Sequence, residues 1–419
     1  MNSSTKIKSI HARQVMDCRF RPAVEVDVTL ENGAVGRGSA SAGISAGQYE
    51  AYTLRDNDPD RFCGLSVFQA IDNIHHIIVP AIYGMDVLDQ GTIDRCMIDL
   101  DGTTNKSKLG GNAIYSVSVA CMQAAAKAHN LDLYQYIAGE KLKTLPLPMA
   151  NSISGGKYPD RTVCFQEFTI CPYKAETITE ALEIIIDVHH AIGQMFTIEQ
   201  NGEPALRGNG HGWLPPTEDP AEIIQLMDEA VKRCGYTDKV AYALDVAASK
   251  MYDPRTGTYY INGKLLTADE QIAYIKGLTE QYNFLFIEDV LDRNDWDGYV
   301  RASKVIDRTI LIGDDITITS LKCLQKAHQT GAVQGFVFKP SQIGTVTEAI
   351  EARRFAKEKG ILTIPSQYKG GTIWDVEVEA CKSCAPCGGE GVYAMNSIYR
   401  AAEENLDAKL FDFSSMVRF

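Results

Sequence analysis

The sequence predicts an α/β protein with two domains: an α+β N-terminal domain over residues 1–140 and a (β/α)8-type barrel over residues 141–419. From residue 240 onward, short apolar runs end in a polar residue and lead into a helical segment, which is typical of parallel α/β structure. The polar residues that end the last four runs stand 25 to 27 residues apart. This spacing holds one strand, one helix and two loops, and it favours a barrel over an open sheet.

Strands and helices are mixed in the first third of the chain. Residues 6–11 and 23–30 are expected strands, because valines alternate with polar residues in the second run and the turn signal Glu31-Asn32-Gly33 follows it. Residues 112–129 form an alanine-rich segment with few helix breakers, and residues 131–137 continue its helical periodicity. The prolines between residues 142 and 148 indicate a linker, so we place the domain boundary near residue 140.

Five predicted barrel strands share one design, in which an apolar run ends in a polar side chain. The runs are residues 240–244, 284–287, 309–313, 335–338 and 361–365, and the residues that end them are Asp245, Glu288, Asp314, Lys339 and Ser366. Catalytic groups of such barrels lie at the strand ends over the barrel mouth, so we expect these five side chains to face one another. Residues 391–406 are expected to form a closing helix whose apolar face carries Val392, Met395, Tyr399, Ala402 and Leu406.

Composition excludes several classes of protein. The chain has 419 residues, and its 45% hydrophobic and 23% charged residues are ordinary for a globular protein and argue against wholesale disorder. The net charge of −13 disfavours binding to nucleic acid or to an anionic membrane. The 11 cysteines are odd in number and scattered, and we find neither an export signal nor a membrane-spanning run. We therefore expect a cytoplasmic protein.

Three of the strand-end residues, Asp245, Glu288 and Asp314, are acidic. Carboxylates crowded into one barrel mouth repel each other by about 4 kcal/mol per close pair. Each acid alone is more often a helix cap or a solvated loop residue, but three at matched strand ends indicate a cation site. Because oxygen ligands without histidine suit a hard dication, we predict Mg²⁺ or Mn²⁺ rather than Zn²⁺.

Lys339 ends the fourth of these runs and is the candidate base. Beside a bound dication and away from solvent, the protonated form of a lysine is disfavoured, so its amine can accept a proton near neutral pH. A base next to a metal that chelates a carboxylate suits removal of the proton α to that carboxylate, with the metal stabilising the enediolate. Lys382 offers a second cation for the same dianion, although an isolated lysine is usually a solvated surface residue.

Several segments resemble the enolase family in order and spacing. In the barrel half these are residues 244–249, 286–289 with 295–298, 313–315 and 342–344, and in the N-terminal third they are residues 17–19, 54–56, 98–102 and 105–113. The resemblance implies an N-terminal capping domain, a homodimer or larger homo-oligomer, and an essential Mg²⁺ held by Asp245, Glu288 and Asp314. It also implies that Lys339 is the α-proton base, Lys382 an enolate stabiliser and Glu167 an active-site acid.

The chain departs from the enolase pattern on its substrate-facing side. Residues 208–212 lack the acid that helps enolases expel the β-hydroxyl; His211 is a candidate replacement, the alternative being simple loop packing. Tyr158 replaces a substrate-contacting histidine, and residues 366–369 lack the arginine that grips the substrate phosphate. Because lysines remain in both segments, we expect an anionic substrate. The expected substrate-binding residues are Tyr158, Lys157, Ser366, Gln367 and Lys369.

Three functions remain open at this point. The first is a Mg²⁺-dependent lyase acting on a small anionic carboxylate other than ordinary 2-phosphoglycerate, which we favour because the metal ligands and the base are kept while the substrate-facing residues differ. The second is a phosphopyruvate hydratase that tolerates unusual loops and converts 2-phosphoglycerate to phosphoenolpyruvate. The third is a non-catalytic binding or structural protein with the enolase fold, against which the retained acids and lysines argue.

Overall fold

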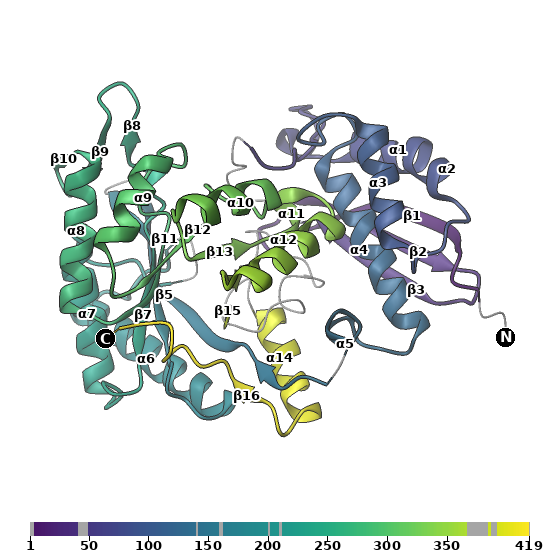
Figure 1. The fold of residues 1–419 in the computed structure, drawn as a ribbon. Coiled ribbons are helices and arrows are strands. Elements are labelled where there is room, and N and C mark those ends of the chain that lie inside the picture. Colours follow the sequence, from purple (N-terminus) through teal and green to yellow (C-terminus); the bar gives the residue numbers. More distant parts are fainter. Residues whose placement is uncertain are drawn as a thin grey trace.

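The computed structural model describes residues 4–40, 49–139, 141–158, 162–199, 202–208, 212–366, 384–386 and 392–418. Its N-terminal elements gather on one side of the molecule and the barrel elements on the other (Figure 1). Among these residues, every helix is too short or too polar to cross a membrane. The combination of the two parts confirms the predicted α/β class.

The N-terminal part is built on a small antiparallel sheet. Strands β1 (Ile7–Met16), β2 (Pro22–Leu30) and β3 (Val35–Ala40) pair in that order, which confirms the predicted hairpin between β2 and β3. The predicted alternation in β2 is confirmed, because its inward side chains are fully buried: Val24, Val26, Val28 and Leu30. Strand β1 extends beyond the predicted residues 6–11, since it pairs with β2 as far as Met16.

Helices cover this sheet. The predicted helix over 112–129 is α4 (Gly111–Ala128), and the next is α5 (Leu133–Ala138). The others are α1 (Phe68–Asn73), α2 (Val79–Ile82) and α3 (Gln90–Asp101), with a 3₁₀ turn at Phe62–Gly64 and a π-helical turn at Ile74–Ile78. Helix α4 lies very close to β3, because a Cβ atom at Gly36 or Gly38 would come within 2.1 or 2.5 Å of backbone atoms of α4.

The C-terminal part is a curled eight-stranded sheet in the order β14-β13-β12-β11-β7-β6-β5-β15. Its strands are β5 (Leu147–Lys157), β6 (Thr162–Cys171), β7 (Ala241–Asp245), β11 (Phe284–Glu288), β12 (Ile310–Gly313), β13 (Gly335–Phe338), β14 (Leu362–Pro365) and β15 (Cys384–Pro386). The two end strands, β14 and β15, lie next to each other, so the sheet curls round on itself. This agrees with the predicted barrel.

One strand of the barrel runs against the expected direction. Strand β6 is antiparallel to both of its neighbours, β5 and β7, whereas β7, β11, β12, β13 and β14 are parallel to one another. Strand β6 begins only five residues after the end of β5, and the described residues between them are not helical. An antiparallel pair can be joined by a short connection, while a parallel pair needs a longer crossover.

Helices surround the barrel, and small strands extend it. The helices are α6 (Ile178–Glu199), α7 (Pro220–Arg233), α8 (Ala268–Gln281), α9 (Trp296–Val305), α10 (Leu321–Thr330), α11 (Pro340–Ile343), α12 (Val346–Lys359) and α14 (Val392–Glu404), with a 3₁₀ turn at Ala248–Lys250. Strands β8 (Tyr252–Asp253), β9 (Thr258–Ile261) and β10 (Lys264–Leu266) form a separate sheet. Strand β4 (Thr144–Leu145) pairs with β16 (Lys409–Leu410).

The predicted closing helix is present as α14, and its predicted apolar face is confirmed in part. Helix α14 ends at Glu404, and Leu406, outside it, is 86% exposed. Met395 is buried as predicted, and it packs with Ile398 against Ile178 at the start of α6, where Ala402 is partly buried. Tyr399, by contrast, is 38% exposed. The partner helix therefore decides which of the apolar positions of α14 is covered.

Side chains along the barrel strands alternate between two cores. In β7, Tyr242 and Leu244 belong to the layer between strands and helices, whereas Ala241 and Ala243 belong to the cluster inside the barrel. The inner cluster also contains Leu285 and Phe286 of β11, where the pairing with β7 shifts register, and residues of the next three strands: Ile310 and Ile312 of β12, Val337 of β13, and Leu362 and Ile364 of β14. Because side chains in a strand repeat every two residues, the inward series continues into the polar residue at the end of each strand.

Candidate active site

The strand-end residues meet at one mouth of the barrel. The inward series places Asp245 after Ala243 and Glu288 after Phe286, and the two acids lie in register across β7 and β11. Asp314 stands two residues after the inward-facing Ile312, and Lys339 stands two residues after the inward-facing Val337, so the two-residue period of a strand turns both toward the inside of the barrel. The alternation of apolar residues thus brings three acids and an amine to a common place.

A compact group of carboxylates lies at this mouth. Ligand oxygens of Glu288, Asp289 and Asp314 are all within 4.8 Å of one another. Burial, together with the charges of Asp245 and Asp314, raises the pKa of Glu288 well above its ordinary value. Such a cluster needs protons or a cation to reduce the repulsion between its members.

Asp245 lies beside this group rather than within it. In the part of the chain that the structure describes, the compact oxygen group does not include Asp245. Its charge nevertheless acts on Glu288 in the neighbouring strand, and its Oδ2 accepts a hydrogen bond of 2.5 Å from Nε2 of Gln166. Asp245 is 9% exposed, so its carboxylate shares the buried environment of the cluster.

Lys339 forms an ion pair with one of the acids. Its Nζ lies 2.6 Å from Oδ2 of Asp314, and both side chains are 14% exposed. Burial lowers the pKa of Lys339, but the charges of Asp314 and Glu288 outweigh burial and raise this pKa well above its ordinary value. A raised pKa favours the protonated amine in this arrangement. The neutral amine expected from the sequence belongs to the state in which a dication is bound beside it.

Asp289 holds the loop that follows β12. Its Oδ1 and Oδ2 accept hydrogen bonds of 3.0 Å from the backbone N–H groups of Asp314 and Asp315, and Tyr299 donates its hydroxyl to Oδ1 over 3.3 Å. Asp315 in turn pairs with Arg293 over 2.8 Å. Sequence reasoning did not single out Asp289; the signal was a second acid directly after the strand-end acid Glu288.

Glu167 faces the same mouth from β6. It lies in register with Asp245 on β7 and with Ser154 on β5, and it is partly buried. The pairing of β5 with β6 shifts register between Ser154 and Gly156, which leaves several residues of β6 opposite Gly155. Bulges of this kind re-aim side chains next to active sites, and here Gln166 reaches Asp245 directly.

Two family models together match most of the chain. The model of the enolase N-terminal domain matches residues 7–137, and the model of the enolase C-terminal TIM barrel domain matches residues 142–417. The chain belongs to the enolase family. The family resemblance inferred from the sequence is therefore confirmed, and membership supports an enolase-like lyase in general terms.

Enolases are generally Mg²⁺-dependent, and the acidic cluster of this chain fits that ion. The compact group consists of carboxylates alone, and carboxylate oxygen is the ligand type that Mg²⁺ prefers. Burial, and then the charges of Asp245 and Asp314, raise the pKa of Glu288, although Lys339 pairs with Asp314. The donor set therefore suits a hard dication better than a metal that prefers nitrogen or sulfur ligands.

The expected substrate-binding residues of this enolase-family chain are only partly described. The Tyr158 hydroxyl lies 3.0 and 3.1 Å from the carbonyl oxygens of Ser154 and Gly155, which accept its hydrogen. Lys157 is exposed at the end of β5, and Ser366 follows β14, partly buried, with its N–H donated to the Phe338 carbonyl. The remaining candidates lie outside the described residues: His211, Gln367, Lys369 and Lys382.

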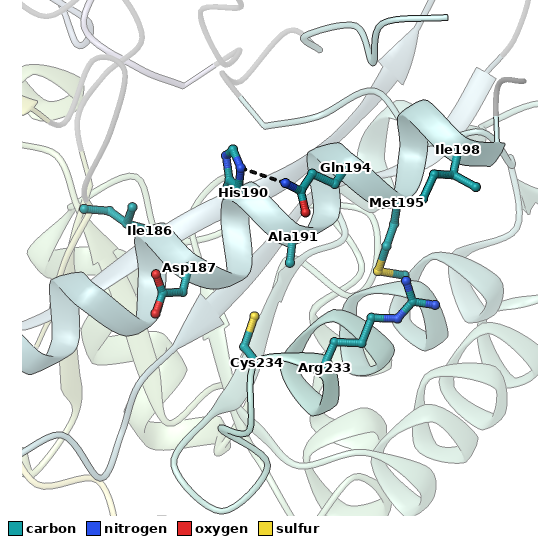
Figure 2. A pocket seen from close by; sticks show the side chains of 9 residues that line it. All are labelled: Ile186, Asp187, His190, Ala191, Gln194, Met195, Ile198, Arg233 and Cys234. Atoms are coloured by element: carbon teal, nitrogen blue, oxygen red, sulfur yellow. Dashed lines mark hydrogen bonds between the residues drawn. The ribbon is translucent and has the colours of Figure 1, made fainter. Parts of the chain in front are cut away.

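A surface groove lies on the outside of the barrel, away from the strand ends. It has a volume of about 610 Å³ and is lined by residues of α6, by Arg233 at the end of α7 and by Cys234 (Figure 2). Ile186 and Ile198, on its α6 side, are 64% and 69% exposed. The described residues that line this groove include none of the predicted site residues, so the candidate active site remains the barrel mouth.

Proposed function

We propose that this protein is a Mg²⁺-dependent lyase that removes the proton α to a carboxylate and eliminates a β-leaving group, acting on a small anionic substrate other than ordinary 2-phosphoglycerate. The observation that carries the proposal is the ion pair at the barrel mouth, where Nζ of Lys339 lies 2.6 Å from Asp314 within the carboxylate cluster. The candidate base thus lies directly beside an oxygen-rich group that suits a cation.

Each residue of the site has a proposed role. Asp245, Glu288 and Asp314 would hold Mg²⁺, which supplies the positive charge that stabilises an enediolate when it is bound. Lys339 would take the α proton on Nζ. This step needs a neutral amine, and a cation that neutralises the carboxylates would favour it, because their charges would then hold the proton on Nζ less strongly. Glu167 is proposed as an active-site acid. Lys382 is proposed to stabilise the enolate, and His211 is the candidate replacement for the acid that helps expel the leaving group.

The choice of substrate rests on the sequence of the substrate-facing segments. Residues 208–212 lack the acid that helps enolases expel a hydroxyl, and residues 366–369 lack the phosphate-gripping arginine. Lysines remain at positions 157 and 369, which supports an anionic substrate. A sulfonate, a phosphonate, a second carboxylate or a differently placed phosphate would suit these cations.

The proposed chemistry is tested by deuterium exchange. Small hydroxy, phospho and sulfo acids are incubated with the protein in D₂O, with and without Mg²⁺, and α-deuterium is measured by mass spectrometry. Mg²⁺-dependent exchange is expected for at least one acid, and Lys339→Ala should abolish it. The matched control is Lys322→Ala, on the exposed surface of α10, which should leave exchange intact. Unchanged exchange in Lys339→Ala would show that another group is the base.

A phosphopyruvate hydratase is the second candidate, and it is favoured by the match of both domains to enolase models. Formation of phosphoenolpyruvate from 2-phosphoglycerate at about 1–10³ turnovers per second, the usual range for enzymes, would favour it over our first proposal. A non-catalytic role would be indicated by a calorimetric titration in which the protein takes up no Mg²⁺. We also propose a cytoplasmic homo-oligomer, which size-exclusion chromatography with light scattering tests for its oligomeric part.

A further inference from the structure

We propose that Gln342 is a positioning residue for the carboxylate of Asp314, and that Glu50 of the N-terminal domain holds Gln342 in place. This inference rests on the function proposed above, because it gives Asp314 the part of a metal ligand. Gln342 lies on α11, three residues after Lys339, and 292 residues separate it from Glu50.

The amide of Gln342 is shared between two carboxylates. Its Nε2 donates hydrogen bonds of 2.8 Å to Oδ1 of Asp314 and of 3.2 Å to Oε1 of Glu50. On its other side, Oε1 accepts a hydrogen bond of 3.1 Å from the hydroxyl of Thr319. Since both N–H hydrogens of an amide are on one atom, two carboxylates on one side and a hydroxyl on the other fix the orientation of the amide.

The two oxygens of Asp314 are therefore held by different donors. Oδ2 accepts from Nζ of Lys339 over 2.6 Å, and Oδ1 accepts from Gln342. The backbone N–H of Asp314 is also fixed, because it donates to Asp289. Without Gln342 the carboxylate of Asp314 would lose one of these restraints. It could then rotate out of the orientation in which it contacts both a bound cation and Lys339.

The N-terminal domain contributes to this arrangement through side chain and backbone. Glu50 is 5% exposed and Gln342 is 2% exposed, so their hydrogen bond is shielded from water. The backbone N–H of Ala51 donates to the carbonyl oxygen of Gln342 over 2.7 Å. At Gly344 a Cβ atom would lie 2.9 Å from Cβ of Ala51, which shows how closely the two segments approach.

An uncharged donor is required at position 342. A carboxylate there would add a further negative charge beside Asp314 and Glu50, and a lysine would form an ion pair that competes with Lys339 for Asp314. The neutral amide offers two hydrogens to two carboxylates without altering the net charge of the cluster. This is why we assign Gln342 to positioning rather than to charge balance.

The first test measures Mg²⁺ binding alone, in the absence of any substrate. Isothermal titration of the Gln342→Met variant, which has a similar volume but no donor, should show Mg²⁺ affinity about 10–100-fold weaker than that of the wild type, the usual effect of removing a hydrogen bond to a metal ligand. The control is Gln123→Met on α4, another buried glutamine away from the mouth, which should bind Mg²⁺ as the wild type does. Melting in EDTA reports folding separately.

The second test uses rescue by a conservative variant. Glu50→Gln keeps an oxygen that can accept the hydrogen bond from Gln342, so its Mg²⁺ affinity should stay close to that of the wild type. Glu50→Leu removes the acceptor, and its affinity should fall. On a substrate identified by deuterium exchange, Gln342→Met should lower kcat at saturating Mg²⁺ more than it changes KM, because the misplaced groups act on the reacting proton.

The outcomes separate this inference from the proposed function. If the wild type binds Mg²⁺ and a folded Gln342→Met binds it equally well, the positioning role is wrong while the proposed function stands. If the wild type takes up no Mg²⁺, both fail. Should Gln342→Met not fold, the two Glu50 variants decide: loss in Glu50→Leu with rescue in Glu50→Gln supports the inference, and equal affinities overturn it.

Discussion

The buried carboxylate of Asp94, on α3 of the N-terminal domain, accepts a hydrogen bond of 3.0 Å from the backbone N–H of Thr347 at the start of α12 in the barrel. Asp94 is fully buried, and it also accepts from the hydroxyl of Thr347 over 2.5 Å and from Nε2 of Gln90 over 3.0 Å. This acid therefore ties the two domains together at the helix that follows the Lys339 segment.

Replacing Asp94 with alanine should weaken this tie. The change leaves the backbone N–H and the hydroxyl of Thr347 without their acceptor, so we expect the free energy of unfolding to fall by about 1–3 kcal/mol. Urea denaturation followed by circular dichroism measures this loss. Asp99→Ala, at an exposed position of the same helix, is the control and should change stability very little. Equal stability of the two variants would contradict the structural role of Asp94.

The Glu288→Gln substitution should have opposite effects on stability with and without metal. In EDTA the variant should be more stable than the wild type, because a neutral amide removes the cost of burying a charge and the repulsion from Asp245 and Asp314. In Mg²⁺ at about 100 times its dissociation constant, the wild type should gain about 2.7 kcal/mol, and the variant should gain much less.

Thermal melting in EDTA and in Mg²⁺ measures both effects for Glu288→Gln. Glu280→Gln, an exposed acid on α8, serves as the control and should show the Mg²⁺-dependent gain of the wild type. If Glu288→Gln gains as much from Mg²⁺ as the wild type does, Glu288 is not a metal ligand.

His189 should make the protein less stable in mild acid. Its ring stacks on Trp213 with centroids 5.4 Å apart, and its Nε2 lies against the guanidinium of Arg207. Burial, followed by the charges of Arg207 and His190, lowers the pKa of His189 to about 4. Because the unfolded chain binds this proton near pH 6.5 and the folded protein does not, stability should fall as the pH drops from about 6.5 to 4.

The His189→Phe variant tests this linkage. Phenylalanine keeps an aromatic ring beside Trp213 but cannot be protonated. Between pH 6.5 and 4, His189 should make the free energy of unfolding fall by up to about 1.4 kcal/mol per pH unit, and the variant should lack this contribution. Urea midpoints measured across this pH range give the slope. His190→Gln, at the exposed neighbouring position, should retain most of it. An unchanged slope in His189→Phe would assign the acid sensitivity to other groups.

Replacement of glycine by alanine should have opposite effects on stability at two positions. At Gly38 the new Cβ atom would lie 2.5 Å from backbone atoms of α4, so α4 must move away from β3 and several kcal/mol of stability should be lost. At Gly277, within α8, no atom lies within 4 Å of the new Cβ, and alanine should stabilise the helix by about 1 kcal/mol. Chemical denaturation of both variants measures the difference, and a stable Gly38→Ala would mean that α4 can shift freely.

The positions of the strand-end residues were predictable because they depend on periods along the chain. The alternation in β7 and β12 sets which side chains face inward, and the spacing of 25 to 27 residues sets the barrel. The direction of β6 was not predictable from its residues, since the pattern of a strand is the same in either direction. The same limit applies to α14, where Met395 is buried as predicted but the packing against Ile178 also buries Ile398, and Leu406 lies beyond the end of the helix.

The sequence by itself determined the class of fold, the family and the acids and lysine at the strand ends, because these depend on local periodicity and on short motifs. Only the tertiary structure decided how those groups are held. Asp289 fixes the loop of Asp314 through backbone hydrogen bonds, and Gln342 meets Glu50 across 292 residues of sequence. Such contacts depend on the distance and direction of atoms in three dimensions, which no spacing along the chain expresses.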